Sequence, residues 1–113
     1  MKKRTNDIII PWEMVLLSLL TKEDMYGSQI AKEIKSLSNG KFTILMGSMY
    51  PILYKLADEQ CVEFYEKAVG RRLTVVYYHI TDKGRERMME LLNEFRADIA
   101  VVESVMDACI SGK

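Results

Sequence analysis

Residues 46–56 read MGSMYPILYKL, and this stretch decides the fold. Its apolar residues have helical spacing, and the proline among them limits where the helix can begin. Proline has no amide hydrogen and clashes with the carbonyl four residues earlier, so Pro51 favours the first turn of a helix. We therefore expect a helix from Ser48 to Gln60, with Ser48 as its N-terminal cap.

This helix divides into two unlike faces. At about 100° per residue, the core face consists of Met49, Ile52, Leu53, Leu56 and Ala57. The outward face carries hydroxyls, a flat apolar ring and a single lysine, and consists of Ser48, Pro51, Tyr54, Lys55 and Asp58. A solvated face is usually richer in glutamate and lysine, so this face predicts a contact surface. The alternative is that its tyrosines pack under a neighbouring loop.

The composition predicts one globular domain in the cytoplasm. The chain has 113 residues, 49% of them apolar and 28% charged, and no run approaches the roughly 18 apolar residues of a membrane span. The basic opening lacks the uninterrupted apolar core of a signal peptide. Cys61 and Cys109 lie far apart and His79 is the single histidine. We expect no metal, no cofactor and no catalytic site.

The neutral net charge hides a gradient along the chain. Residues 67–87 hold six basic and two acidic residues, a net charge of +4, whereas residues 88–113 hold two basic and five acidic ones, a net charge of −3. Steering toward phosphates depends on the local field, which salt screens beyond roughly 8 to 10 Å. The total charge therefore does not exclude nucleic acid.

Two helices are expected before the quoted stretch. Residues 11–22 predict a short helix with Pro11 at its first position and apolar residues nearly all round. Residues 23–40 predict an amphipathic helix with Lys32 outward, which ends at Ser38–Gly40. Its inner stripe is Ile30, Ile34 and Leu37. Together with the quoted helix, it has the outline of a helix-turn-helix.

A β-hairpin and a long helix follow. VEFYEK (62–67) and LTVVYYHI (73–80) predict strands joined by AVGRR, so Arg71 and Arg72 lie at the tip. Directly after a helix-turn-helix, such a hairpin is interpreted as a wing rather than as a solvated loop. Residues 81–110 predict one helix, capped by Thr81 or Asp82.

The long helix has more apolar surface than so small a domain can cover. We expect a homodimer formed through the two ends of the chain, and the alternative is a helix folded wholly onto its own domain. The predicted interface consists of Trp12, Leu16, Phe95, Ile99, Val102, Val105, Met106 and Cys109.

These parts, in this order, resemble the PadR family of bacterial transcription regulators. The matching segments are YGSQIAKEI, GSMYPILYKL, the wing turn GRR and YYHITDKGRE. The resemblance implies a mainly α-helical fold with a small β-hairpin: a winged helix-turn-helix DNA-binding domain (1–80) and a C-terminal dimerisation helix (81–113). It implies a homodimer that represses transcription.

Two positions depart from the family pattern. Gly27-Ser28 stands where the family commonly has Gly-Tyr, so any role of that second ring is absent here. Cys61 stands where the family usually ends the recognition helix with glycine. If that position is left-handed, Cys61 carries a steric penalty.

On this interpretation the helix 48–60 lies in the major groove of double-stranded operator DNA, and the wing reaches phosphates or the minor groove. The predicted DNA-binding residues are Lys32, Ser48, Tyr50, Pro51, Tyr54, Lys55, Arg71 and Arg72. The alternative is a dimeric protein-interaction module of the same fold that no longer binds DNA.

The resemblance also leaves a small-molecule effector as an open hypothesis, because several members of the family bind aromatic or cationic drug-like molecules between their subunits. The residues expected to line such a cavity are Trp12, Met14, Met88, Met89 and Phe95. The alternative is that these side chains belong to the core.

Overall fold

The computed structural model describes residues 10–112, which form four helices and a three-stranded antiparallel sheet. The mainly helical winged fold predicted from the sequence is confirmed, and the basic opening lies outside the described residues. The elements are α1 (Trp12–Leu20), β1 (Met25–Tyr26), α2 (Gly27–Leu37), α3 (Met46–Asp58), β2 (Val62–Val69), β3 (Leu73–Ile80) and α4 (Asp82–Ile110).

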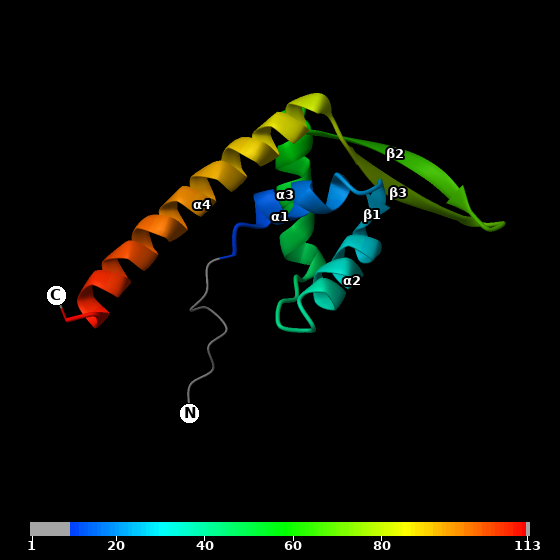
Figure 1. Ribbon diagram of the computed structural model, residues 1–113. Helices are drawn as coiled ribbons and strands as arrows, with labels where there is room; N and C mark the ends of the chain where they lie inside the picture. Colours follow the sequence, from blue (N-terminus) through cyan, green and yellow to red (C-terminus); the bar gives the residue numbers. More distant parts are fainter. Residues whose placement is uncertain (1–9, 113) are drawn as a thin grey trace.

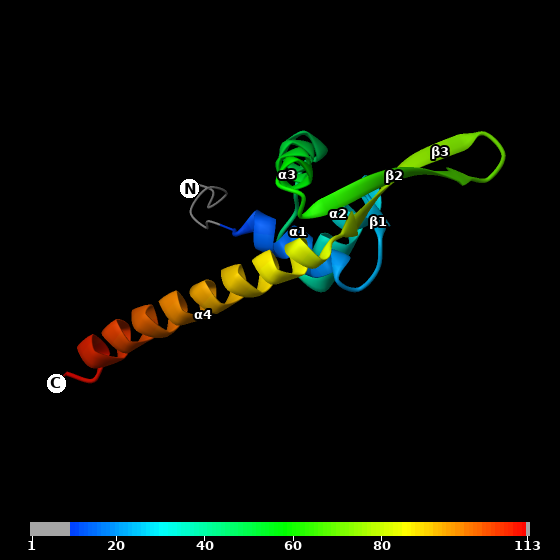
Figure 2. The same cartoon turned by 90° about the horizontal axis from the view of Figure 1, so that it is seen from above.

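Three helices form a body from which two arms extend in opposite directions. Figures 1 and 2 show α1, α2 and α3 at the centre, the β2–β3 hairpin on one side and α4 on the other. The molecule is therefore elongated, with extents of 66 × 38 × 21 Å. In Figure 2, α3 stands above α1, with one long side turned away from the rest of the chain.

The first helix is the centre of the core. Pro11 precedes α1 as its N-cap, so the prediction that Pro11 is the first helical residue was wrong by one position. The buried residues of α1 are Met14, Leu16, Leu17, Leu19 and Leu20. Leu16 is 0% exposed inside its own domain. Its place in the predicted dimer interface was therefore wrong, since a side chain fully enclosed by its own core offers no surface to a partner.

The second helix begins later than predicted. Met25 and Tyr26 form β1, which pairs with β3, so α2 starts only at Gly27. Ile30 and Ile34 are buried as predicted, but Leu37 is 64% exposed and does not belong to the inner stripe. The chain then leaves the helix through Asn39 and Gly40, both with positive φ.

The sheet has the order β1-β3-β2, so β3 is its central strand. Val62 pairs with Ile80 and Phe64 with Tyr78 across the hairpin. Val62, Tyr78 and Ile80 are each 2% exposed, which anchors the base of the hairpin in the core, whereas every residue of β2 after Val62 is exposed. The wing is thus fixed at one end and free at the other.

A small polar junction connects the exit of α3 to the start of α4. The Thr81 hydroxyl donates to the Gln60 carbonyl at 2.7 Å and accepts from the Gly84 amide at 2.9 Å. The Thr81 amide donates to the Cys61 carbonyl at 3.0 Å. Of the two caps predicted for the long helix, the structure has Thr81. One threonine therefore closes the hairpin and begins α4.

The C-terminal half of α4 leaves the domain. All residues from 93 to 110 are exposed, although many are apolar. At 1.5 Å per residue the 29-residue helix is about 43 Å long. Beyond Asp98, which still lines a cavity with α1, no described part of the domain lies beside the helix (Figure 1). The alternative of a helix folded wholly onto its own domain therefore does not hold for residues 10–112.

The junction predicts opposite effects of one substitution at two glycines. A Cβ added at Gly84 would overlap the Cys61 carbonyl oxygen and lie 2.8 Å from Ile80 Cγ1, whereas one added at Gly47 meets nothing within 4 Å. Gly84→Ala should lower the free energy of unfolding by about 1 to 3 kcal/mol or more. Gly47→Ala should raise it by roughly 0.5 to 1 kcal/mol, as expected for alanine in a helix. Urea titrations followed by circular dichroism measure both, and equal tolerance of the two changes would contradict the packing described.

Candidate nucleic-acid interface

The third helix presents the predicted polar face to solvent. Met49, Leu53 and Leu56 are 0% exposed, and Ile52 and Ala57 are half-buried against the same core. All residues predicted for the outward face are exposed: Ser48, Pro51, Tyr54, Lys55 and Asp58. The alternative that the tyrosines pack under a loop does not hold for Tyr54, which is 56% exposed. This face is therefore exposed to solvent and can meet a partner.

The start of α3 differs from the prediction. The helix begins at Met46, with Leu45 as N-cap and no side-chain cap, so Ser48 is its third residue and not its cap. Pro51 consequently lies in the second turn, where it cannot donate to the Gly47 carbonyl. Both residues are exposed. The missing bond leaves a backbone acceptor on the outward face, where water or a ligand can reach it.

The end of α3 also differs. The left-handed residue is Gln60, with φ +65°, and not Cys61. The predicted steric penalty at Cys61 was therefore wrong, since its side chain is simply buried, 1% exposed, and burial raises the pKa of its thiol. The strain lies at Gln60, whose carbonyl accepts the Thr81 hydroxyl.

A cleft of about 350 Å³ separates α3 from the wing. Its hydroxyl-bearing wall includes Tyr50 and Tyr54, whose rings stack with centroids 6.3 Å apart, and Tyr78, which is 2% exposed. Burial, and then the neighbouring Tyr54 and Tyr50, raise the pKa of Tyr78. The complete lining is Tyr26, Gly27, Ser28, Met46, Tyr50, Tyr54, Val75, Val76 and Tyr78. The cleft thus offers hydroxyl groups beside apolar surface between α3 and the wing.

Sequence reasoning found Tyr50 and Tyr54 but missed the start of α2 and Tyr78 as parts of this cleft. The Tyr50 hydroxyl would lie 2.5 Å from a Cβ at position 27, so any larger residue there would require the Tyr50 ring to shift. Ser28 borders the cleft where the family pattern has a second ring. The predicted Lys32 is exposed farther along α2. No pattern in the sequence indicates that residues 27 and 50 are in contact.

The wing carries its charge at the free end. Gly70, with φ +71°, turns the chain between β2 and β3, and Arg71 and Arg72 follow it, both exposed. Among the described residues neither arginine has an ion-pair partner. The ammonium of Lys67 lies 5.2 Å from the centroid of the Tyr77 ring. Both guanidinium groups remain available to an anion.

The base of the wing is held by Asp24, in the link before β1. Its carboxylate accepts from the Tyr65 hydroxyl at 2.6 Å and bonds His79 Nδ1 at 2.8 Å. Burial would raise the pKa of Asp24, but these two hydrogen bonds, together with the nearby charges of His79 and Lys67, lower the pKa overall. The bond to Asp24 raises the pKa of Tyr65 to about 12. The single histidine therefore belongs to the attachment of the wing.

The only cation of α3 is not free. Lys55 Nζ donates to Glu13 Oε2 of α1 at 2.7 Å, and this bond raises the pKa of Lys55. The other oxygen of Glu13 lies 3.7 Å from Arg87 Nη2 on α4. Neither Glu13 nor Arg87 was singled out from the sequence, because they are remote from position 55 along the chain. One carboxylate thus joins three helices.

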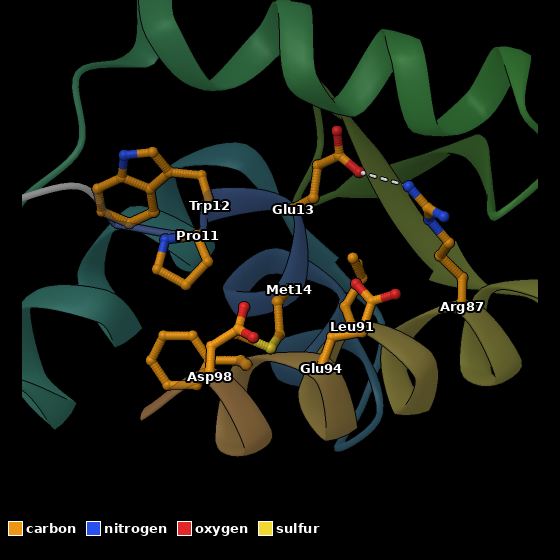
Figure 3. Close-up of a pocket in the computed structure, with 9 residues that line it drawn as sticks. Pro11, Trp12, Glu13, Met14, Arg87, Leu91, Glu94 and Asp98 are labelled. Carbon is orange, nitrogen blue, oxygen red and sulfur yellow. Dashed lines mark ion pairs between the residues drawn. The ribbon is translucent and has the colours of Figure 1, made fainter. Parts of the chain in front are cut away.

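A second concave region lies between α1 and α4. Figure 3 shows this cavity with Trp12 and Met14 among its walls and the Glu13–Arg87 pair at one end. Its volume is about 430 Å³, and Phe95 also lines it. Its full lining is Pro11, Trp12, Glu13, Met14, Arg87, Leu91, Glu94, Phe95 and Asp98. Met88 and Met89 were expected beside these residues but do not line this cavity of the single chain; the cavity predicted between two subunits stays a prediction. Met88 packs against the core, and Met89 is 48% exposed on α4 outside the cavity.

An adjoining apolar groove of about 480 Å³ runs from α1 to the end of α2. It shares Trp12, Met14 and Phe95 with the cavity, and its other walls include Val15 and Leu37. The exposed apolar residues of α4 continue from Phe95 through Ile99, Val102, Val105, Met106 and Cys109. Groove and helix together form one extended apolar surface.

The described part of the chain holds neither a metal-ligand cluster nor a membrane-spanning helix. Within residues 10–112 no group of three or more metal-ligating side chains comes together. None of the helices in this part of the chain is long and apolar enough to cross a membrane.

A helix pair whose second member exposes a polar face, followed by a hairpin rooted in the same core, defines the winged helix-turn-helix class. The family model described as "Transcriptional regulator PadR-like family" matches residues 16–90. The chain therefore belongs to this family, a family of transcriptional regulators and not of enzymes. The resemblance seen in the sequence is confirmed.

Individual relatives agree with this assignment. An uncharacterized protein of Lysinibacillus sphaericus is 28% identical over 88% of each chain. The Transcriptional regulator YqjI of Escherichia coli is 25% identical over 84% of this chain, which spans only 42% of YqjI.

Among solved structures, a transcriptional regulator from Clostridium thermocellum shares the fold, with a TM-score of 0.76, 23% identity and coverage of 81% of this chain and 89% of that one. Bacillus subtilis PadR, solved in complex with operator DNA, matches with a TM-score of 0.66 and 27% identity, over 72% of this chain and 46% of its own. A PadR-like regulator from Bacillus cereus matches with a TM-score of 0.72 and 26% identity, over 84% of this chain and 90% of its own.

The strained residue at the end of α3 yields a prediction. Gln60→Gly should raise the free energy of unfolding by about 1 kcal/mol, because a left-handed conformation costs a residue with a Cβ roughly 1 to 2 kcal/mol. Gln60→Ala is the matched control: it removes the same side chain but retains the strain, so it should bring no gain. Thermal unfolding of both variants measures the difference. Equal stabilities would mean that the backbone at residue 60 is not strained.

Proposed function

We propose that this protein is a sequence-specific DNA-binding transcriptional repressor that acts as a homodimer in the cytoplasm. The observation that carries the proposal is the outward face of α3, fully exposed beside a wing whose two terminal arginines are free of ion pairs within the described residues. The B. subtilis PadR structure, solved with operator DNA, supports it. Repression, rather than activation, is the role that the resemblance to the PadR family implies.

The two parts of the surface have different roles in this proposal. Ser48 and Tyr54 offer hydroxyls and Pro51 an apolar contact to base edges in the major groove, which is where sequence is recognised. Arg71, Arg72 and Lys32 contact phosphates, which positions the protein without recognising sequence. Tyr50 lines the cleft between helix and wing and contributes its hydroxyl to the phosphate backbone. Two copies of α3 on one duplex require a dyad operator with half-sites about one helical turn, 34 to 36 Å, apart.

The second copy is proposed to cover the apolar surface of α4. Phe95, Ile99, Val102, Met106 and Cys109 follow one another at alternating spacings of four and three, which is the a/d repeat of a coiled-coil seam. The groove beside Trp12 continues this surface onto α1 and α2. We propose that α4 pairs along its seam with the partner and contacts the partner's groove.

Division of the chain into a DNA-binding part, residues 1–80, and a dimerisation helix, residues 81–113, is part of the same proposal. A small-molecule effector, if it acts, is proposed to enter the cavity beside Trp12, Met14 and Phe95. Trp12 is the single tryptophan, so its fluorescence would report occupancy of this cavity by a candidate compound.

Genome-wide capture of bound DNA tests the proposal as a whole, because it supplies operator and regulated genes together. Enriched sites should share a dyad sequence. Absence of any enriched sequence, with the protein folded and dimeric, would favour the alternative of a protein-interaction module that no longer binds DNA.

The roles of helix and wing are separated by variants. Replacing Arg71 and Arg72 with alanine should weaken binding to operator and scrambled duplex alike and lower the salt dependence by roughly two phosphate contacts per subunit. Tyr54→Phe or Ser48→Ala should instead reduce the difference in binding free energy between operator and scrambled duplex by about 1 to 3 kcal/mol. Anisotropy titrations at several salt concentrations measure both effects. An unchanged affinity and salt slope in the arginine variant would show that the wing does not touch DNA.

Dimerisation predicts a sharp effect at one position of α4. Val102 is 51% exposed in the single chain, so Val102→Asp should leave the protomer folded. At the seam, an unpaired carboxylate costs several kcal/mol, which raises the dissociation constant of the dimer by at least about 100-fold. Ser104→Asp adds the same charge on the opposite side of the helix and should leave the dimer intact. Sedimentation at micromolar concentration should give twice 13.1 kDa for the wild type and for Ser104→Asp. A wild type that sediments as a folded monomer would contradict the proposal.

A further inference from the structure

Glu13 lies where three helices meet and is shared between two cations. Its Oε2 accepts from Lys55 Nζ of α3 at 2.7 Å, and its Oε1 lies 3.7 Å from Arg87 Nη2 of α4. Figure 3 shows the carboxylate directed toward Arg87 below α3. The side chain is a bridge between the proposed recognition helix and the proposed dimerisation helix.

Lys55 is the only lysine or arginine in α3. While it is bonded to Glu13, its charge is largely neutralised and its ammonium is held toward α1. The Lys55 side chain is 57% exposed, and an ion pair so close to water is weak. A phosphate of DNA can therefore replace Glu13 as the partner of Lys55.

After that exchange, Arg87 can serve as the cationic partner of Glu13. The Arg87 Nε atom is buried and has no hydrogen-bond partner among the described residues. Its Nη2 is already near Glu13, yet 3.7 Å is too long for a good hydrogen bond. When Lys55 releases the Glu13 carboxylate, the carboxylate can move closer to the Arg87 guanidinium, so its negative charge remains paired with a positive one.

We propose that Glu13 is a positioning residue that limits DNA affinity: it holds Lys55 away from DNA in the free protein, and transfers to Arg87 when Lys55 moves to a phosphate. This inference rests on the proposed function. Removing the carboxylate therefore strengthens DNA binding through Lys55, and removing Arg87 weakens it by leaving Glu13 with Lys55 alone.

The test uses Glu13→Gln in the full-length protein, with labelled operator and scrambled duplexes titrated at several salt concentrations. Glu13→Gln should tighten binding to both duplexes by about two- to fivefold per subunit, the range of an exposed ion pair. The salt slope should stay as in the wild type, because Lys55 reaches the same phosphate in both. Glu33→Gln is the matched control, since Glu33 pairs with Lys22, at 3.7 Å, and not with α3.

Lys55→Met distinguishes an effect of Glu13 that acts through Lys55 from a general electrostatic effect of removing a negative charge. Alone, it should weaken binding and lower the salt slope by about one phosphate per subunit. In the Lys55→Met background, Glu13→Gln should have no effect beyond that of Glu33→Gln. If Glu13→Gln still increased DNA affinity in the Lys55→Met background, the inference would be overturned. It would also be overturned if, in the otherwise wild-type protein, Glu13→Gln increased affinity no more than Glu33→Gln does.

A second variant tests the same network in the opposite direction. Arg87→Gln should weaken binding more than Arg96→Gln, which removes the same charge from an exposed position of α4. Equal losses would overturn the role of Arg87. If the wild type binds neither duplex, the proposed function itself fails, whereas wild-type binding with a silent Glu13→Gln rejects only the role of Glu13.

Discussion

The Thr81 hydroxyl is the interaction on which the arrangement of the molecule depends. It donates a hydrogen bond to the Gln60 carbonyl, just after α3, and accepts one from the Gly84 amide, which has no helical partner in the first turn of α4. Two segments 21 residues apart are thereby fixed in contact, with the whole hairpin between them. The wing, α3 and α4 all take their directions from this point.

The junction also explains a glycine. The first turn of α4 passes so close to the Cys61 carbonyl that no side chain fits at Gly84. The Thr-x-x-Gly pattern at residues 81–84 is therefore one device: threonine supplies the cap and the link to α3, and glycine permits the close approach. Backbone strain occurs next to it, at Gln60, where the chain turns out of the recognition helix.

Electrostatics divide the molecule in a similar way. Within residues 10–112 the arginines at the wing tip have no ion-pair partner, but the charge on α3 is held by Glu13. The proposed DNA surface thus has one part that is always available and one that must exchange partners. Since Glu13 also faces Arg87 and the cavity beside Trp12, the same residue lies between the proposed DNA surface and the proposed dimer surface.

The sequence by itself determined the class of fold, the two faces of α3, the charged wing tip and the excess apolar surface of α4, because all of these follow from local periodicity and turn chemistry. It misplaced the start of α3, since a proline in the second turn is tolerated once tertiary packing fixes the helix. It could not find β1, the enclosure of Leu16, the cleft between Gly27 and Tyr50, or the Glu13–Lys55 bond. Each of these depends on residues remote in sequence and adjacent in space, and only the packing of the elements decides which of them meet.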